Sequence, residues 1–459
     1  MTDSPKKKAL IISYAFPPSA AVGVYRILKF CKYLPQFGWE PVVLTVEEGH
    51  SHSQDPSLFK QLPDDIKIYR SKSPAPLVWY EKKTGKGPAA GVAPASEKAK
   101  SSGSSAPPPA DTPPPPQSMA SRIKGYIRRL IFTPDDNCFW VPYGVSKGME
   151  AIKNEQIDVI FSTSPPASAH LIGYWLSVRS GLPLVIDFRD LWTQNAGYHL
   201  KNKPAPARAW DRFLEKRAMK RSSCIVTATD GFTGQVLEKN PYKTPDSVVT
   251  ITNGLDPDDF ASVSFPTEKN DRFTILYLGS LYGARNPYFF FEAMQHWLAQ
   301  RPEVADKVRV EFVGGGEAYA KATVGTPLES IVRFVGHMPQ QQALSKLWQA
   351  DMLLLLLGFG DTHTTVIPAK LFEYIATGRP ILAFVPEGQS AGLIRKYNRG
   401  AAVTSPDKDA VAAFLSEQFG HWQERSGPPL SKLDLPEEFD RRTKTRRLAE
   451  IFDSVRKSH

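Results

Sequence analysis

The stretch from Gly358 to Ile381 reads Gly-Phe-Gly-Asp-Thr-His-Thr-Thr-Val-Ile-Pro-Ala-Lys-Leu-Phe-Glu-Tyr-Ile-Ala-Thr-Gly-Arg-Pro-Ile. The apolar run before it, Met352–Leu357, predicts a buried strand. Pro368 suits the first turn of a helix, Gly378 suits its C-terminal cap, and Pro380 opens the next strand. Buried strands that alternate with helices are typical of parallel sheets, so this stretch predicts the α/β class.

The same alternation continues outward from this stretch over most of the chain. Between the predicted strands lie helices such as Val24–Leu34, on which Arg26, Lys29 and Lys32 are expected opposite the apolar side chains. The further predicted strands are Leu10–Tyr14, Val42–Val46, Asp158–Ser162, Leu184–Phe188, Cys224–Ala228, Val248–Thr252, Phe273–Leu278, Val308–Val313, Val332–Val335 and Pro380–Phe384. Two doubly wound, Rossmann-like parallel-sheet domains that face a central cleft are therefore expected.

The domain boundaries follow from changes in composition. We predict an N-terminal domain over residues 1–255, a polar connector at 256–271, a C-terminal domain at 272–440 and a final helix at 441–459. Residues 84–118 contain nine prolines and no aromatic side chain, so this segment is expected to be a disordered insertion.

Composition excludes several classes of protein. With 459 residues, of which 41% are hydrophobic, the chain can build substantial cores. The three cysteines (Cys31, Cys138 and Cys224) cannot form a disulfide framework or a thiolate zinc site. No apolar run reaches the roughly 18–20 residues that a membrane span needs, so a cytoplasmic protein is expected. The net charge of +10 indicates an anionic partner.

In open parallel sheets, ligands bind beyond the carboxyl ends of the strands, often at helix N-termini. The backbone around Ile367, Pro368 and Ala369 should therefore bind an anion, and Lys370 adds a positive charge. Glu373, one turn later, can accept both hydroxyls of a ribose. For an isolated helix, a solvated Lys/Glu pair is the competing interpretation.

Other strand ends carry further candidates in the second half of the chain. Arg285 follows the strand Phe273–Leu278 and is placed to neutralise a diphosphate. His337 and Met338 follow another strand, where the backbone could bond a nucleobase edge, although most lone histidines are structural.

In the first half, Asp187, Arg189 and Asp190 end a strand that faces the same cleft, and a local Arg–Asp salt bridge would explain part of this cluster. Gly23 opens the first helix, where a ligand could approach the backbone. The segment lacks G-x-G-x-x-G, which disfavours an NAD-dependent dehydrogenase.

Taken together, the segments resemble the GT-B glycosyltransferases, specifically the retaining group often numbered family 4. The similarity covers nearly the whole chain except residues 84–118. It rests on the order and spacing of these motifs: Phe-Pro-Pro followed by Gly23 and Arg26, Ser164-Pro-Pro, Asp187-Phe-Arg-Asp-Leu-Trp, Thr252-Asn-Gly-Leu-Asp-Pro-Asp-Asp-Phe, Leu278-Gly-Ser with Arg285-Asn-Pro, Phe334-Val-Gly-His-Met-Pro, and Lys370-Leu-Phe-Glu-Tyr-Ile-Ala-Thr-Gly-Arg-Pro.

The resemblance implies that Glu373 is the second glutamate of the family's paired-glutamate motif, and that Arg285 is one of its two basic residues. Thr365 and Ser280 stand where the other glutamate and the other basic residue are usual. The strand-end positions and the resemblance together predict the site residues. Those expected to bind the donor are Gly23, Ser280, Arg285, His337, Met338, Ile367, Pro368, Ala369, Lys370 and Glu373, those on the acceptor side are Arg26, Asp187, Arg189 and Asp190, and the catalytic ones are Asp190, Arg285 and Lys370.

The implied reaction is hexosyl transfer, with retention, from a nucleoside diphosphate sugar to a saccharide or a polyprenyl-diphosphate-linked acceptor in cell-surface polysaccharide synthesis. No cofactor and no metal is implied, and Asp256-Pro-Asp-Asp259 is interpreted as part of the connector. An NAD-independent nucleotide-sugar epimerase of the same fold and a non-catalytic scaffold of polysaccharide assembly are the alternatives.

Two basic segments add a hypothesis about the membrane. Ser121–Phe132 interleaves cations with Ile123, Ile127, Leu130 and Ile131, and Arg208–Arg221 is a basic helix. Basic amphipathic helices commonly lie on anionic bilayers, which predicts peripheral attachment to the inner membrane face, although a solvated helix face is the alternative. No nucleic-acid recognition module is present, so nucleic acid is not an expected partner.

Overall fold

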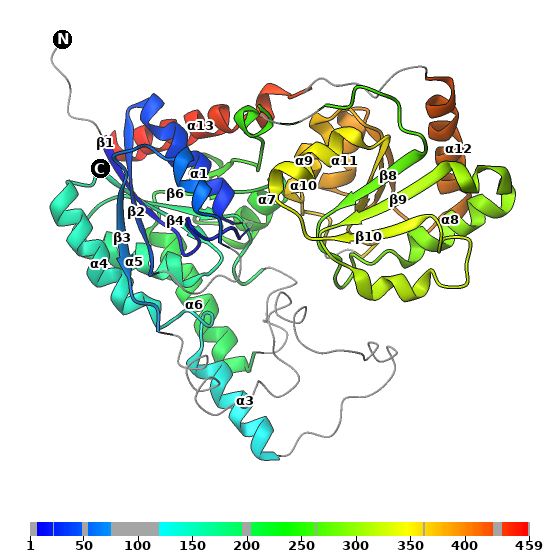
Figure 1. Ribbon diagram of the computed structural model, residues 1–459. Coiled ribbons are helices and arrows are strands. Elements are labelled where there is room, and N and C mark those ends of the chain that lie inside the picture. The colour runs from blue at the N-terminus through cyan, green and yellow to red at the C-terminus, as the bar shows by residue number, and fades with distance from the viewer. Residues whose placement is uncertain are drawn as a thin grey trace, which may run out of the picture. The chain divides into compact units, whose positions relative to one another are not determined.

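The computed structural model describes residues 7–21, 23–47, 54–74, 119–194, 203–261, 263, 265–360, 363–425 and 434–457. The predicted insertion at 84–118 lies outside the described residues. The chain divides into two compact units, each with its own parallel sheet (Figure 1). Unit 1 is Met1–Thr252 together with Arg441–His459, and unit 2 is Asn253–Asp440.

The sheet of unit 1 has seven strands among the described residues, in the order β3-β2-β1-β4-β5-β6-β7, and every pair of neighbours is parallel. The strands are β1 (Lys7–Ile12), β2 (Trp39–Val46), β3 (Lys67–Ser71), β4 (Val159–Ser164), β5 (Leu184–Phe188), β6 (Cys224–Thr227) and β7 (Val248–Thr250). The strand order reverses between β1 and β4, which is where ligands bind in sheets of this kind.

Seven α-helices belong to the described part of unit 1. They are α1 (Val24–Tyr33), α3 (Met119–Ile131), α4 (Trp140–Glu155), α5 (Ser168–Ser180), α6 (Ala205–Arg221), α7 (Asp230–Lys239) and α13 (Arg441–Lys457). Helix α1 corrects one expectation, because Arg26 and Lys29 are buried with its apolar residues. Both have partners in the interior: Lys29 donates to Gln61 Oε1 at 2.7 Å, and Arg26 pairs with Asp187. The amphipathic pattern placed both cations on the solvent side of α1, but acceptors in the interior allow both to be buried.

The final helix, α13, belongs to unit 1 although the whole of unit 2 precedes it in sequence (red in Figure 1). The Phe452 ring is fully buried and lies 5.2 Å from the Trp39 ring and 5.7 Å from the Phe161 ring. Helix α13 therefore completes the same core as β1, β4 and α1.

Unit 2 has a six-stranded parallel sheet among the described residues, in the order β10-β9-β8-β11-β12-β13. Its strands are β8 (Phe273–Leu278), β9 (Val308–Val313), β10 (Val332–Gly336), β11 (Met352–Leu356), β12 (Ile381–Phe384) and β13 (Gly400–Val403). Its α-helices are α8 (Tyr288–Gln300), α9 (Gln340–Gln349), α10 (Ala369–Ala376), α11 (Gln389–Lys396) and α12 (Lys408–Glu424). Here the order reverses between β8 and β11.

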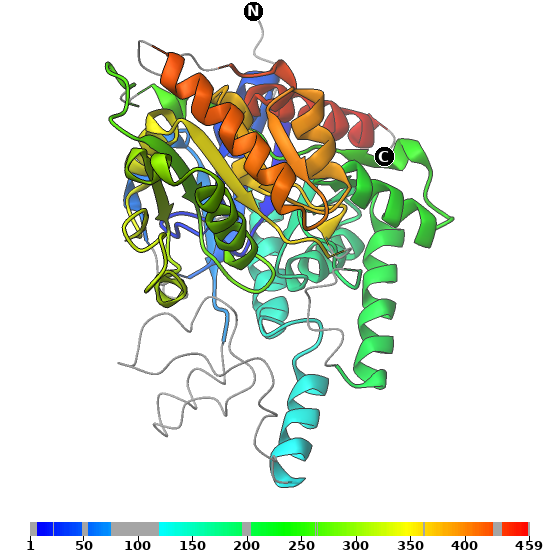
Figure 2. The ribbon, with the colours of Figure 1, turned by 90° about the vertical axis from the view of Figure 1, so that its right-hand side faces the viewer.

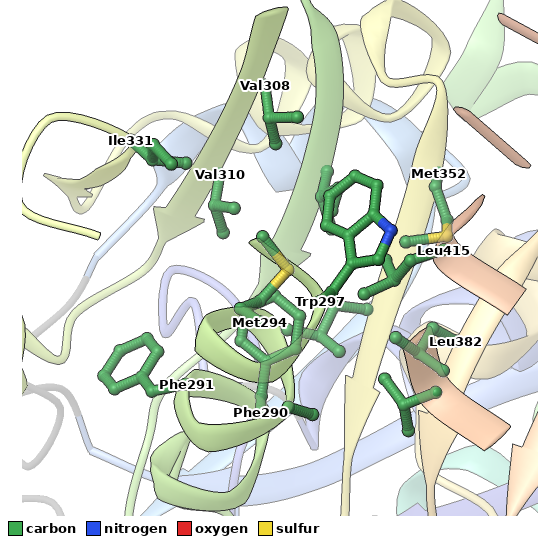
Figure 3. Packing of buried hydrophobic residues seen from close by; sticks show 14 of the residues in the cluster. Phe290, Phe291, Met294, Trp297, Val308, Val310, Ile331, Met352, Leu382 and Leu415 are labelled. Carbon is green, nitrogen blue, oxygen red and sulfur yellow. The ribbon is translucent and has the colours of Figure 1, made fainter. Parts of the chain in front are cut away.

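Two apolar cores flank the unit 2 sheet. On one face α8 and α12 pack against the strands, and Figure 3 shows Trp297 and its neighbours on α8 turned toward Val308, Val310 and Met352. The Trp297 indole N–H is satisfied by Ser416 Oγ at 2.8 Å. On the other face α9, α10 and α11 surround Trp348 and Phe372. Strand β11 is buried on both faces, as its unbroken apolar sequence predicts.

The segment predicted as a connector, residues 256–271, is part of unit 2 in the structure. Pro257–Phe260 form a 3₁₀ helix that Asp256 caps by accepting the Asp258 N–H at 3.0 Å. Phe260 is buried against Trp348, with ring centroids 5.1 Å apart. Phe260 and Val263 both contribute to the unit 2 core, so unit 2 begins before them. The chain enters unit 2 at Thr252–Asn253 and returns to unit 1 at Asp440–Arg441.

Candidate functional site

At the carboxyl end of β8, the backbone is held by two side chains of α10. Tyr374 Oη accepts the Leu278 N–H at 2.9 Å, and Lys370 Nζ donates to the Leu278 carbonyl at 2.9 Å. These bonds fix the first turn of α10 beside the point where the strand order of unit 2 reverses. The predicted anion-binding residues at 367–370 therefore lie at the position that the fold rule indicates.

The Lys370 side chain is part-buried beside the Tyr277 ring. Its Nζ is 3.9 Å from the centroid of the Tyr277 ring, which provides a cation–π contact. Burial, followed by the nearby Arg285 charge, lowers the pKa of Lys370 to about 7, and Glu373 opposes both effects. Near neutral pH this amine is thus poised to gain a proton when an anion arrives.

Arg285 is held by a tight turn, in which its N–H donates to the Tyr282 carbonyl at 2.9 Å. Its guanidinium carbon lies 4.9 Å from the Tyr282 ring centroid. The pKa of His363 is lowered by burial and then by the charge of Arg285. Within unit 2, Arg285 therefore lies close enough to Lys370 and His363 for its charge to lower their pKa values, and Glu373 lies close enough to affect Lys370.

Glycines with positive φ lie at the carboxyl ends of three neighbouring strands. Gly279 (φ 128°), Gly314 (φ 109°) and Gly336 (φ 76°) follow or end β8, β9 and β10. A Cβ on Gly314 would lie 3.0 Å from the Gly279 carbonyl carbon, and a Cβ on Gly279 would lie 3.0 Å from Lys370 Nζ. Glycine is therefore needed at Gly279 and Gly314. Because neither residue has a side chain, a ligand can approach the backbone at these strand ends closely.

The run Gly314-Gly315-Gly316 was missed by the motif analysis, although the sequence contained a signal. Three glycines directly follow the predicted strand Val308–Val313, and all three have positive φ. Ser280, which stands where a basic residue is usual in the family, donates from its hydroxyl to the Gly314 carbonyl at 3.2 Å. Ser280 therefore joins two strand-end loops and adds no charge.

The remaining candidates of unit 2 lie along the same edge. His337 is exposed, with Nε2 3.6 Å from the position that a Cβ on Gly315 would take. Met338 is half-buried against the apolar core that contains Trp348. At the start of α10, Ile367 and Pro368 are buried and Ala369 is exposed. The first amides of a helix have no intrahelical acceptor, so this helix end can bind an anion.

In unit 1, the structure separates the predicted acceptor-side residues into two pairs. Arg26 and Asp187 form a buried ion pair in which Nη2 lies 2.7 Å from Oδ1. Arg26 also donates to the Ile251 and Thr252 carbonyls at 2.8 and 3.2 Å, and Thr163 donates to Asp187 at 2.7 Å. Arg26 and Asp187 are thus buried and bonded to internal partners.

The second pair, Arg189 and Asp190, is accessible. Arg189 Nη2 lies 3.6 Å from Asp190 Oδ2, and 42% of the Asp190 side chain is exposed. The Arg189 guanidinium lies against Gly23: a Cβ there would lie 2.3 Å from Nη1, so Arg189 would have to shift. Ser164 Oγ donates to the Asp190 carbonyl at 3.2 Å. Gly23, Arg189 and Asp190 thus lie together at the carboxyl edge of the unit 1 sheet.

A buried polar network next to Asp190 was also missed. The Trp192 indole N–H donates to Asp211 at 2.9 Å, and the Thr193 N–H donates to Glu215 at 3.1 Å. Lys203 pairs with Asp211 and donates to the Pro134 carbonyl at 2.6 Å. The signal was the i, i+4 spacing of the two acids in an otherwise basic helix.

The described residues contain no group of three or more His, Cys, Asp or Glu side chains arranged to hold a metal ion. Within the same part of the chain, no helix combines the length and the apolar character that crossing a bilayer requires.

Two family models match the chain and together cover about two thirds of it. Residues 106–259 match the model described as Glycosyltransferase Family 4, and residues 272–418 match the one described as Glycosyl transferases group 1. No curated protein matches the chain.

Solved structures show the same fold at low sequence identity. Sucrose-phosphate synthase from Thermosynechococcus elongatus is 12% identical, with a TM-score of 0.52 over 98% of this chain and 97% of that one. WaaG, a glycosyltransferase involved in lipopolysaccharide biosynthesis, is 14% identical, with a TM-score of 0.51 over 98% of both chains. A putative UDP-N-acetylglucosamine 2-epimerase from Listeria monocytogenes is 10% identical, with a TM-score of 0.52 over 99% of this chain and 98% of that one.

Proposed function

Because the chain belongs to the GT-B glycosyltransferases of the family 4 type, which use nucleotide sugars, we propose that it transfers a hexose with retention to a saccharide or lipid-linked acceptor. The observation that supports this most directly is the pair of cations, Arg285 and Lys370, at a glycine-lined strand edge beside the start of α10. A departing nucleoside diphosphate needs such an environment.

In the proposed reaction, the bond between the anomeric carbon and the diphosphate oxygen breaks, and the acceptor oxygen bonds to the same face of that carbon. The acceptor proton passes to the departing diphosphate. The charge that builds up on this leaving group is stabilised by Arg285, by protonated Lys370 and by the first amides of α10. An incoming diphosphate favours the charged form of Lys370, because an opposite charge raises the pKa of an amine.

The other unit 2 residues are proposed to hold the rest of the donor. Glu373 accepts the ribose hydroxyls, and the backbone near His337 and Met338 bonds the base. The bare glycines allow the diphosphate to approach the chain closely.

On the acceptor side, Asp190 is proposed to orient the attacking hydroxyl, with Arg189 beside it and Gly23 leaving room for the Arg189 guanidinium. Arg26 and Asp187 are proposed to hold this strand end in place from the interior.

We further propose that the transfer requires no metal ion, since Arg285 and Lys370 supply the positive charge that a metal would otherwise provide at the diphosphate. Activity should then be the same after exhaustive dialysis against EDTA and after addition of Mg²⁺ or Mn²⁺. Loss of activity in EDTA that either metal restores would contradict this part of the proposal.

Peripheral attachment to the cytoplasmic face of an anionic membrane is also proposed, for synthesis of a cell-surface polysaccharide on a polyprenyl-diphosphate-linked acceptor. Helices α3 and α6 contact each other, and α3 extends away from the sheet of unit 1 (Figures 1 and 2). We name their exposed apolar and basic side chains the α3–α6 ridge. Its residues are Tyr126, Ile127, Arg129, Leu130, Ile131, Trp210, Arg212, Phe213, Lys216, Arg217 and Lys220.

Composition supports this use of the ridge. Exposed aromatic and aliphatic side chains suit the boundary between headgroups and acyl chains, and the cations suit anionic lipids.

Co-sedimentation with phosphatidylglycerol vesicles tests the proposed membrane attachment. Trp210→Ala/Phe213→Ala should reduce binding severalfold. Wild-type binding to neutral phosphatidylcholine vesicles as tight as to phosphatidylglycerol vesicles would argue against an electrostatic contribution.

A thermal-shift screen with UDP, GDP, ADP and their sugars tests the donor site. One nucleotide should stabilise the protein, by about 2.7 kcal/mol at a concentration 100 times its Kd. The stabilisation should be lost in Arg285→Ala and Glu373→Ala. The matched control is Lys307→Ala. Lys307 is an exposed cation just before β9, at the end of that strand away from the proposed donor site.

Product analysis separates the proposal from its two alternatives. A transferase consumes the stabilising sugar nucleotide only when an acceptor is added, and its product keeps the anomeric configuration of the donor. An epimerase converts the sugar nucleotide without any acceptor. A scaffold protein would show no turnover of any sugar nucleotide with any glycolipid fraction.

A further inference from the structure

Helix α6 has two faces of opposite chemistry. Its two acids, Asp211 and Glu215, are only 1% and 7% exposed. The outward face carries Trp210 and Phe213, which are 53% and 45% exposed and stack with ring centroids 5.2 Å apart. The exposed charged residues of α6 are the cations Arg212, Lys216, Arg217 and Lys220. Because both acids point inward, the outer face of α6 carries positive charge only.

The inward carboxylates hold the chain segment that follows Asp190. Asp211 accepts the Trp192 indole N–H at 2.9 Å. Glu215 accepts the Thr193 N–H at 3.1 Å and also the Thr193 hydroxyl. Burial raises the pKa of both carboxyl groups. Lys203 and then Trp192 oppose the rise at Asp211, and the Thr193 bonds oppose it at Glu215. A displaced α6 would leave buried polar groups without partners, which is unfavourable.

The segment held by α6 is short, so it cannot move independently of Asp190. Thr193 is three residues after Asp190, and the Asp190 carbonyl is itself fixed by Ser164 at 3.2 Å. Leu191 and Trp192, between them, are both buried. The position of Asp190 is therefore set at one end by β4 and at the other end by α6.

We propose that Asp211 and Glu215 are positioning residues that couple the lipid-facing side of α6 to the acceptor-side segment 190–193. The coupling rests on the proposed membrane attachment. A bilayer that takes up Trp210 and Phe213 binds the ordered helix and stabilises it by linkage. Because Trp192 and Thr193 are hydrogen-bonded to Asp211 and Glu215 of α6, stabilising the helix also stabilises the conformation of these two residues. The acceptor-side segment thus becomes most ordered when the enzyme is on the surface that bears a lipid-linked acceptor.

Hydrogen exchange measured by mass spectrometry tests the coupling without a known acceptor. The full chain is compared with and without vesicles of phosphatidylglycerol and phosphatidylethanolamine. Vesicles should slow exchange of the amides at 190–194 by roughly threefold or more, because these amides exchange through local opening. Amides of α8 in unit 2 provide the internal control and should not change.

Glu215→Ala should bind the vesicles as the wild type does but show no slowing at 190–194. Glu215→Gln keeps an acceptor for the Thr193 N–H and should restore most of the slowing. A purely structural role would change exchange equally with and without vesicles. If Glu215→Ala does not fold, Trp192→Phe removes the bond to Asp211 while keeping an aromatic ring, and it should likewise reduce the slowing.

Each remaining outcome separates the two proposals. Vesicle binding by the wild type without slowing at 190–194 overturns the coupling and leaves membrane attachment standing. Absence of vesicle binding overturns both, while nucleotide stabilisation in the thermal-shift screen still reports on the donor site. Trp210→Ala/Phe213→Ala, which binds vesicles severalfold more weakly, should show correspondingly less slowing at 190–194 at the same vesicle concentration.

Discussion

Lys370 is the residue whose surroundings most affect the proposed chemistry. It stands on α10 but reaches the carboxyl end of β8, where Ser280 supplies no charge. Burial and the Arg285 charge, which lower the pKa of Lys370, are also what make it responsive to a bound anion. The sequence showed the residue, but its protonation behaviour follows from its neighbours.

The first prediction concerns pH. Above about pH 7 the free enzyme loses the Lys370 proton, and a diphosphate that needs this proton binds more weakly, by up to about tenfold per pH unit. Titration calorimetry between pH 7 and 9 should show this decline together with proton uptake on binding. Lys370→Met should bind more weakly at pH 7 and show neither effect. Identical pH profiles in the two proteins would exclude Lys370 as the titrating group.

The same pKa affects the stability of the unliganded protein with a defined sign. The folded pKa lies below the unfolded one, so the unfolded chain binds more protons between these two values. Stability therefore rises with pH through that window, and Lys370→Met should reduce the rise.

The second prediction concerns the Arg26–Asp187 pair. Arg26→Ala leaves the Asp187 carboxylate buried without its counterion, which should cost about 3–5 kcal/mol of the stability of unit 1. Urea unfolding measures this loss. Arg189→Ala is the control, because its partly exposed partner Asp190 can be solvated and the change should stay within about 0.5 kcal/mol. Equal losses in the two variants would refute the distinction between an internal and an accessible pair.

At the scale of elements, the proposed donor site depends on the loops after β8 and β9, which only glycine can form. Gly314 has φ 109° and lies against the backbone of Gly279, so the loops after β8 and β9 fit together only without side chains. Helix α10 then supplies Tyr374 and Lys370 to the same edge. The loops after β8 and β9 and the helix α10, which are far apart in sequence, thus form one surface.

The third prediction tests these loops. Gly314→Ala should destabilise unit 2 by roughly 1–3 kcal/mol and weaken nucleotide binding, because the new Cβ strains φ and presses on Gly279. Gly420→Ala in α12 is the matched control. Its Cβ meets nothing within 4 Å, so alanine should raise stability by about 0.5–1 kcal/mol. Thermal unfolding with and without the stabilising nucleotide gives both readouts, and an unaltered nucleotide affinity in Gly314→Ala would show that the ligand does not use this loop.

At the scale of the whole molecule, the last helix completes the first unit. Helix α13 brings Leu448 and Phe452 into a core that otherwise belongs to the first half of the chain. Unit 1 therefore cannot reach its full core until the entire chain, including unit 2, has been made.

The fourth prediction follows from that packing. Phe452→Ala should cost about 3–5 kcal/mol, since a fully buried ring between Trp39 and Phe161 is replaced by a cavity. Equilibrium denaturation monitored by tryptophan fluorescence measures the change. The exposed Lys457→Ala on the same helix should change stability by no more than about 0.5 kcal/mol. If Phe452→Ala were equally neutral, α13 would have to be peripheral to the core.

Local patterns in the sequence were sufficient for the parallel α/β class, for most strands and for the edge of each sheet that carries the candidate site. The strands Phe273–Leu278 and Val308–Val313 have the predicted bounds, because buried apolar runs between glycine and proline signals are recorded in the sequence itself. The short strands β3 and β13 were missed, since neither is a continuous buried run.

Only the tertiary structure decided which charges are internal and which are available. Arg26 and Asp187 lie 161 positions apart and neutralise each other, Asp211 and Glu215 turn inward from a basic helix, and Phe260 joins a core instead of a connector. The reason is physical: the burial of a charge depends on partners that folding brings from distant positions. No local pattern specifies those partners.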